Sequence, residues 1–308
     1  MERGHEIKVL DHGYVRYVDS MGTDESVVEA ARMSTGRGFV SWEPYRRCKK
    51  CDGVRAATFT VEDVFLESGR GGSKDCEHDW QDFPRGDLGI LDFMYRNRHA
   101  TPFEFCELHI EVQAPLMVFR EWHRHRTQSY SEFSARYSQM PDLHYLPTLD
   151  RFQRQSSTNR QGSAETIPQG DAAAMRDGLR RQQESIYRDY DADVRYGLTK
   201  EVARLNTPVS RYSKMRAKTD LRNWLAFLLL RMSPNAQWEI RQYANAVVEI
   251  VKAIWPRTYE LFEEHDLCGV RLSRSEVALL RRMLDTTGDF SITSDPGVVT
   301  LLARLVRA

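Results

Sequence analysis

The sequence predicts an α/β fold of the α+β kind, and three observations carry this prediction. Residues 7–19 (IKVLDHGYVRYVD) have the composition of two short strands joined by an Asp-His-Gly turn. Residues 106–113 alternate apolar and polar side chains, which is typical of a half-buried strand. Apolar side chains recur at helical spacing in 221–232 and 236–254. With 308 residues, the chain has room for one large domain or two smaller ones.

Charge and composition exclude several classes of protein. Lys and Arg together number 44, as do Asp and Glu, so the formal net charge is zero, which argues against a protein that coats nucleic acid. No apolar run approaches the roughly 20 residues that span a bilayer, and the N-terminal MERGHEIKVL lacks the apolar core of a signal peptide. The odd number of cysteines, five, suits a reducing compartment. We therefore expect a cytoplasmic protein.

The other elements follow in chain order. Ser26 and Glu29 have the spacing of a capping box, which predicts a helix over 27–33. A helix is also expected over 87–99, and Thr101 with Glu104 forms a second capping box. The later elements are a helix opening at Pro115, a long helix over 172–196, a short helix from Thr199 to Arg204, an extended segment over 209–217, an apolar helix after Asp220, and a helix capped at Ser233.

The segment 124–137, RHRTQSYSEFSARY, is dense in hydrogen-bonding groups. Its three arginines offer planar donor forks that suit phosphates, and Glu132 offers an acceptor for a sugar hydroxyl. Such a segment could bind one nucleotide, or two phosphate-bearing ligands side by side. The alternative is a basic helix end that offsets the helix dipole, followed by a polar loop.

This segment resembles the signature of the flavin-dependent thymidylate synthases, RHRxxSxNExSxRY, with Ser131 in place of Asn. Three other blocks match the family in the same order, at 9–34, 99–104 and 230–244. The resemblance implies a central, mostly antiparallel sheet with long flanking helices in a domain over 1–262. It also implies a homotetramer in which each active site is built from several subunits.

The resemblance implies an enzyme that methylates dUMP at C5 to form dTMP. Methylenetetrahydrofolate would supply the carbon, and FAD reduced by NADPH would supply the reducing equivalents. The positions that match the family's FAD contacts are Ser34, His99, Thr101, Glu104, Arg124, His125, Arg126, Ser131, Glu132 and Arg222. The positions that match its dUMP contacts are Glu121, Glu132, Ser134, Arg136, Arg204 and Arg231.

Arg231 is the expected catalytic residue. Uracil C5 is a poor nucleophile while N3 keeps its proton, and a fixed guanidinium facing N3 and O2 would stabilise the anionic ring. Arg231 ends an apolar helix, where its charge acts strongly. The alternative is an arginine that only compensates the helix dipole. The chain departs from the family pattern at Glu121, Asp220, Ala226 and Asn235, mostly among the flavin contacts.

Two other functions stay open at this point. One keeps the fold and changes the product, as a pyrimidine-nucleotide hydroxymethylase or a dCMP methylase. The other is a non-catalytic protein that binds nucleic acid through a zinc knuckle. The joint presence of Glu132, Ser134, Arg136, Arg204 and Arg231 weighs against the second.

Residues 36–86 read as an insertion, and 263–308 as a C-terminal helical extension. The insertion is rich in Gly, charge and cysteine and has little periodicity. Its Cys-x-x-Cys pair and a later Cys and His predict a structural zinc site made by Cys48, Cys51, Cys76 and His78. A redox-active Cys pair, or coincidence in a Cys-bearing loop, is the alternative.

Overall fold

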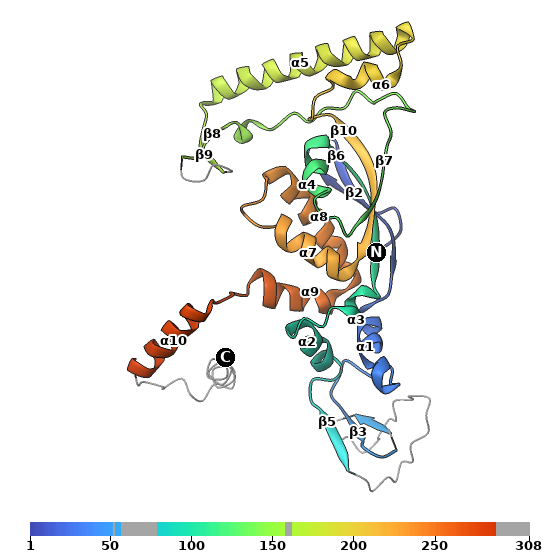
Figure 1. The fold of residues 1–308 in the computed structure, drawn as a ribbon, viewed down its shortest axis with the longest axis vertical. Coiled ribbons are helices and arrows are strands. Elements are labelled where there is room, and N and C mark those ends of the chain that lie inside the picture. Colours follow the sequence, from blue (N-terminus) through green and yellow to red (C-terminus); the bar gives the residue numbers. More distant parts are fainter. Residues whose placement is uncertain (52, 57–78, 158–161, 288–308) are drawn as a thin grey trace. The chain divides into compact units, whose positions relative to one another are not determined.

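The computed structural model describes residues 1–51, 53–56, 79–157 and 162–287 (Figure 1). The chain divides into two compact units, Met1–Phe262 and Glu263–Ala308. Among the described residues, no helix has both the length and the hydropathy that crossing a membrane requires.

The first unit is organised around a five-stranded sheet in the order β1-β2-β6-β10-β7, and every neighbouring pair is antiparallel. The strands are β1 (Glu6–Val9), β2 (Gly13–Met21), β6 (Glu107–Pro115), β10 (Tyr212–Asp220) and β7 (Ser129–Glu132). The alternation that predicted the strand over 106–113 is seen in β6, where Leu108, Ile110 and Val112 are fully buried. The predicted antiparallel sheet is confirmed.

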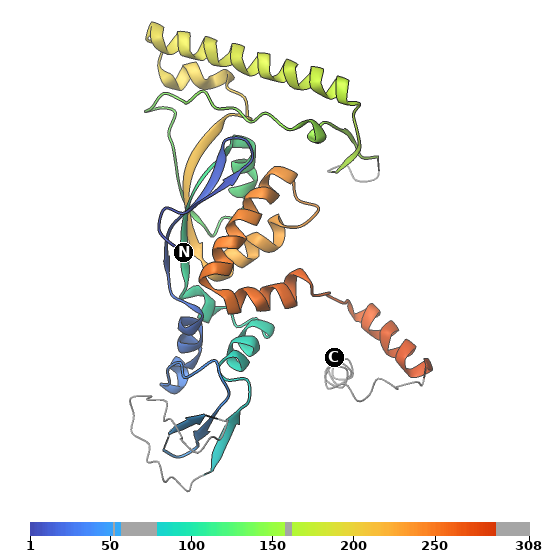
Figure 2. The same ribbon diagram turned by 180° about the vertical axis from the view of Figure 1, so that it is seen from behind.

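Helices α4 (Leu116–Trp122), α7 (Leu221–Arg231) and α8 (Trp238–Ile254) form the core with the sheet (Figure 2). Asp220 caps α7, because its carboxylate accepts the backbone N–H of Asn223 at 2.9 Å. The indole of Trp122 packs against Trp224 and Phe227 of α7, with ring centroids 6.3 and 4.6 Å away. The start predicted for the next helix at Ser233 is wrong: Ser233 closes a turn with Ala236, and α8 begins at Trp238.

Helix α1 (Asp24–Arg32) begins earlier than the predicted Ser26 cap. Thr23 is the N-cap, and Ser26 lies three residues later, where its hydroxyl accepts the Thr23 N–H at 3.1 Å. The short helix η1 (Met33–Thr35) follows, and then, after residues 36–86, α2 (Leu88–Arg96) and α3 (Thr101–Glu104). Gly197, with φ of 100°, ends the long helix α5 (Gln169–Tyr196), as the sequence predicted.

The remaining elements of the first unit connect these parts. They are η2 (Leu149–Arg151), β8 (Gln153–Gln155), β9 (Ser163–Thr166), α6 (Lys200–Ala203), η3 (Arg204–Asn206) and α9 (Pro256–Phe262). The second unit contains η4 (Glu263–Leu267) and α10 (Arg274–Thr287). Ser273 and Glu276 form a capping box at the start of α10, since the carboxylate accepts the Ser273 N–H at 2.7 Å and the Ser273 hydroxyl accepts the Glu276 N–H at 3.4 Å.

The described part of 36–86 contains a small sheet in the order β4-β3-β5, made of β3 (Tyr45–Cys48), β4 (Val54–Ala56) and β5 (Trp80–Phe83). One end of this sheet is attached to the rest of the unit by a buried ion pair between Arg32 and Asp87, 2.6 Å apart. The hydroxyl of Tyr45 donates to the same carboxylate at 2.6 Å. Because both charges are paired and buried, removing one partner would leave an uncompensated charge.

Candidate active site

The guanidinium of Arg231, at the C-terminal end of α7, is held by two other predicted site residues. Its Nε donates to Nε2 of His125 at 2.9 Å. One terminal nitrogen donates to the Glu121 carboxylate and the other to the Glu121 carbonyl, both at 3.1 Å. The side chain of Arg231 is 18% exposed. We name Glu121, His125 and Arg231 the Arg231 cluster.

Burial and charge determine the protonation states in the Arg231 cluster. Burial, followed by the nearby charge of Arg231, lowers the pKa of His125 to about 4. The imidazole is therefore neutral near pH 7, and because Nε2 accepts from Arg231, the ring proton belongs on Nδ1. Burial raises the pKa of Glu121, and Arg231 opposes that change. The cluster therefore holds a fixed arginine with a neutral imidazole on one side.

The segment after α4 leads from the Arg231 cluster to the outer strand β7. The hydroxyl of Tyr130 on β7 donates to the carbonyl of His125 at 2.8 Å, which ties the strand to the cluster. Glu132, at the end of β7, accepts the hydroxyl of Ser213 at 2.8 Å. Beyond it, Arg136 makes an exposed ion pair with Glu201 of α6, 3.3 Å apart. This pair brings the predicted dUMP residues of 132–136 close to the segment that contains Arg204.

The sequence interpretation missed Arg211. Its side chain is 6% exposed, and its Nε has no hydrogen-bond partner among the described residues. Burial lowers the pKa of Arg211, the charge of Glu132 opposes that change, and Arg204 adds to it. A buried arginine that interacts electrostatically with two predicted dUMP ligands is a candidate for binding an anionic ligand. The signal for Arg211 in the sequence was a charged residue directly before a strand in which apolar and polar side chains alternate.

Several of the residues matched to flavin contacts lie together elsewhere in the unit. Ser34, His99 and Thr101 line one cleft of about 520 Å³, with Arg98 beside them. The imidazole of His99 stacks on the ring of Phe93, with centroids 5.8 Å apart. These are hydroxyl, imidazole and guanidinium groups around a surface cleft, a set that suits part of a nucleotide cofactor.

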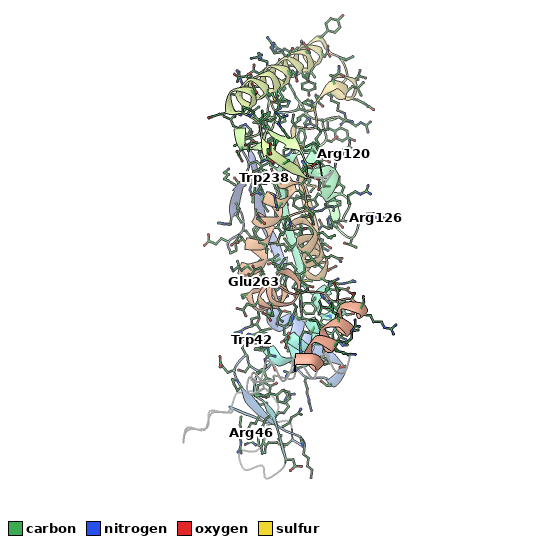
Figure 3. All side chains as sticks on the ribbon, turned by 90° about the vertical axis from the view of Figure 1, so that its left-hand side faces the viewer. Trp42, Arg46, Arg120, Arg126, Trp238 and Glu263 are labelled. Carbon is green, nitrogen blue, oxygen red and sulfur yellow. The ribbon has the colours of Figure 1, made fainter. Side chains whose placement is uncertain are left out.

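The two groups of residues lie at opposite ends of α7. Near its N-terminus, Arg222 pairs with Glu104 of α3 at 2.7 Å. Arg222 and Arg231 are nine residues apart on this helix, which is about 13.5 Å along its axis. Arg124 and Arg126 are exposed, and Figure 3 shows the Arg126 side chain extending outward from the unit. One chain therefore holds two separated groups of predicted site residues, which we name the half-sites.

Two positions that depart from the family pattern have structural partners. Asp220 caps α7 and also accepts the Asn223 side chain at 2.7 Å. Glu121 is engaged by Arg231 through both its carboxylate and its carbonyl. Of the four predicted zinc ligands, Cys48 and Cys51 are described, whereas Cys76 and His78 lie outside the described residues. The described residues contain no group of three or more side chains that could hold a metal ion.

An antiparallel sheet with arginines and carboxylates at one edge, together with a polar cleft beside α3, defines an α+β enzyme that binds nucleotides. Residues 16–257 match the family model described as thymidylate synthase complementing protein. A flavin-dependent thymidylate synthase of Thermus thermophilus is 38% identical over 92% of this chain and 88% of its own length. That of Anaplasma marginale is 36% identical over 91% of this chain and 81% of its own. The chain belongs to the flavin-dependent thymidylate synthase family.

A solved structure extends the likeness to the fold. PolB of Streptomyces cacaoi, a UMP/dUMP methylase bound with 5-Br UMP, matches this chain with a TM-score of 0.63 and 26% identity. The match covers 84% of this chain and 98% of PolB. The family and the fold class that the sequence predicted are confirmed.

Proposed function

We propose that this protein is a thymidylate synthase that methylates C5 of dUMP. The observation that carries the proposal is the Arg231 cluster, which holds a guanidinium in a single orientation at the end of an apolar helix. Arginine has five N–H donors, and three of them are used by His125 and Glu121. Two donors remain for O2 and N3 of a uracil ring. A guanidinium held in this way stabilises the anionic ring without reorganising during the reaction.

The nucleotide's phosphate and sugar would be held by the residues around β7. Arg136, Arg204 and Arg211 supply positive charge, and Arg211 has a buried Nε without a partner among the described residues. Ser134 adds a hydroxyl, which in the free chain accepts the Arg136 backbone N–H at 3.3 Å. Glu132 suits a sugar hydroxyl, because an ionised carboxylate only accepts hydrogen bonds.

FAD would bind in the cleft that Ser34, His99 and Thr101 line, with Glu104 and Arg222 nearby. Polar and aromatic groups around one cleft fit a dinucleotide, and the exposed Arg124 and Arg126 would meet its phosphates. When bound, FAD supplies the reducing equivalents, NADPH reduces it, and methylenetetrahydrofolate donates the carbon. The residues of this chain bind and orient these groups.

We also propose that the active enzyme is a homotetramer with shared sites. The separation of the two half-sites along α7 supports this proposal. So does the exposure of large apolar side chains next to predicted dUMP ligands: Leu205 is 77% exposed beside Arg204, and Leu230 is 60% exposed beside Arg231. Apolar side chains in such positions suit burial against another subunit, which would also complete the site.

The test compares wild-type protein with Arg231→Ala and with a control, Arg181→Ala, on the exposed face of α5. Purified wild type should be yellow and should convert dUMP to dTMP with consumption of NADPH. Arg231→Ala should lose about two orders of magnitude in rate, the usual effect of losing one preorganised donor, while its FAD content and the activity of the control stay unchanged. Near-normal turnover of Arg231→Ala would remove this residue from the mechanism.

The same assay separates the alternative products. PolB is described as a UMP/dUMP methylase, so UMP should be offered beside dUMP and dCMP. If the enzyme methylates UMP or dCMP in preference to dUMP, it is a methylase of that nucleotide and not a thymidylate synthase. If it forms a hydroxymethylated product without NADPH, it is a hydroxymethylase.

A further inference from the structure

A second cleft lies beside the proposed flavin cleft that Ser34, His99 and Thr101 line. It has a volume of about 630 Å³ and lies between α1, α2 and the strand β5, and we name it the β5 cleft. Ser34 and Met94 line both clefts, so the two adjoin. The ring of Phe93 lines the β5 cleft and stacks on His99 of the flavin cleft. A ligand in the flavin cleft can therefore extend into the β5 cleft.

The wall that residues 80–86 contribute to the β5 cleft is fixed on two sides. Arg85 pairs with Asp92 of α2, with a nitrogen-to-oxygen distance of 2.6 Å. The ring of Phe83 stacks on Tyr45 of β3, with centroids 4.7 Å apart. The wall is therefore in place before a ligand arrives, which lowers the cost of binding one.

The lining of the β5 cleft suits a flat base better than a phosphate. Phe83 and Phe93 offer aromatic surface, on which flat rings stack. The exposed Gln81 adds a side-chain amide, whose donor and acceptor match N7 and N6 of adenine. The arginines of the lining, Arg32 and Arg85, are already paired with carboxylates, so they have less to offer to a phosphate.

FAD carries two flat ring systems, one at each end of a pyrophosphate. The flavin ring exchanges reducing equivalents with the other reactants, so it belongs beside the dUMP site. None of the described residues that line the β5 cleft is matched to a dUMP contact. The adenine ring takes no part in the reaction, and a cleft away from the dUMP residues suits it. The hydroxyl and imidazole groups of the flavin cleft suit the ribose and the phosphates between the two rings.

We propose that the β5 cleft binds the adenine ring of FAD, so that residues 80–86 form part of the cofactor site. The inference rests on the proposed function, because it takes FAD as the cofactor. Phe83 and Phe93 supply the aromatic contact, and Gln81 recognises the edge of the base. FMN has the same flavin ring but no adenosine, so its binding should not depend on the β5 cleft.

Gly89 of α2 allows the β5 cleft to be filled while the contacts of its wall stay in place. Gly89 lines the cleft, and a Cβ added there would have Cβ of Arg85, 3.6 Å away, as its nearest neighbour, which is an ordinary contact. Gly89→Trp should therefore place its ring in the cleft. The matched control is Gly178→Trp in α5, where an added Cβ has no described atom within 4 Å.

The first experiment measures the binding of FAD and FMN to the full chain after bound flavin has been removed by dialysis. Gly89→Trp should weaken FAD binding by about 5- to 150-fold, the effect of losing one stacked base, and leave the affinity for FMN unchanged. Gly178→Trp should bind both flavins as wild type does. Unchanged FAD binding in Gly89→Trp would overturn the inference. Equal loss of both flavins, together with a changed oligomeric size, would also overturn it, because the cleft would then contact another copy of the chain.

A second measurement uses wild type alone and does not depend on the folding of a variant. Bound FAD should slow deuterium exchange in 80–86, and saturating AMP, which carries adenine without flavin, should slow the same segment. FMN should leave it unchanged. Exchange in 80–86 that FAD does not slow, or that FMN slows equally, would contradict an adenine site there while leaving FAD as the cofactor. Wild type that binds neither flavin would overturn the proposed cofactor and this inference with it.

Discussion

The contact between His125 and Arg231 predicts that the imidazole positions the catalytic arginine. The matched variants are His125→Leu, which removes the acceptor, and His125→Gln, whose side-chain oxygen replaces it near the position of Nε2. His125→Leu should reduce the rate of dTMP formation, and His125→Gln should keep much of the wild-type rate. A merely space-filling role for His125 would not distinguish an amide from an apolar side chain of similar size.

The magnitude follows from the type of hydrogen bond. The donor belongs to a charged group, the acceptor lies 2.9 Å away, and the arginine is 18% exposed. A hydrogen bond to a charged group contributes about 1.5–3 kcal/mol. If Arg231 acts mainly in the transition state, this corresponds to a fall in kcat/KM of about 10- to 150-fold, since 1.36 kcal/mol is tenfold in rate. The loss should fall on kcat more than on KM.

The assay is steady-state dTMP formation, with the FAD content of each variant measured in parallel. The family resemblance places His125 among the flavin contacts, so FAD content separates the two roles. Positioning of Arg231 predicts unchanged FAD in both variants and a rate restored by Gln alone. Equal loss of rate in Leu and Gln, or loss of FAD in proportion to loss of rate, would refute the positioning role.

Two further predictions follow from the same residues. The pKa of His125 is about 4 in the folded protein and about 6.5 in the unfolded chain, so its contribution to stability is complete above pH 6.5 and is lost as pH falls from 6.5 towards 4, by ~3 kcal/mol. Denaturant titrations at several pH values should show a shallower decline of the unfolding free energy in His125→Gln than in wild type. Identical declines in the two proteins would contradict a lowered pKa of His125. If Arg204 and Arg231 of one site come from different subunits, the inactive variants Arg204→Ala and Arg231→Ala refolded together should regain about a quarter of the wild-type activity, whereas a tetrameric but inactive mixture would place both residues in one subunit.

The fold was predictable where local chemistry and burial agree. The alternation of apolar and polar side chains over 106–113 fits a strand with one buried face, and β6 shows this pattern of burial. Asp220 has a free backbone donor to satisfy at Asn223 and caps α7 as predicted. At Ser233, local chemistry allowed either a helix cap or a turn, and the turn formed instead. The division of the chain at 36–86 and 263–308 stays a prediction.

The site was predictable as a set of residues but not as a set of contacts. The family resemblance located His125 in the motif at 124–137 and Arg231 in the block at 230–244, yet it assigned them to different ligands. Their hydrogen bond joins residues 106 positions apart, and no spacing rule reports such a contact. Arg211 was missed for a related reason, because its importance comes from burial next to Glu132, which only the folded chain reveals. The ligand roles of all these residues stay predictions.

Helix α7 explains how these half-sites keep a constant separation. Its first turn is capped by Asp220 and paired to α3 through Arg222 and Glu104, and Thr101 of α3 lines the proposed flavin cleft. Its last residue is Arg231. Between them, Trp224, Phe227 and Leu228 are fully buried, so the helix cannot shift without disturbing the core. The departure from the family pattern at Asp220 therefore has a structural role, because the Asp220 carboxylate caps the helix and helps to keep both ends of α7 in place. This role does not depend on contact with the cofactor.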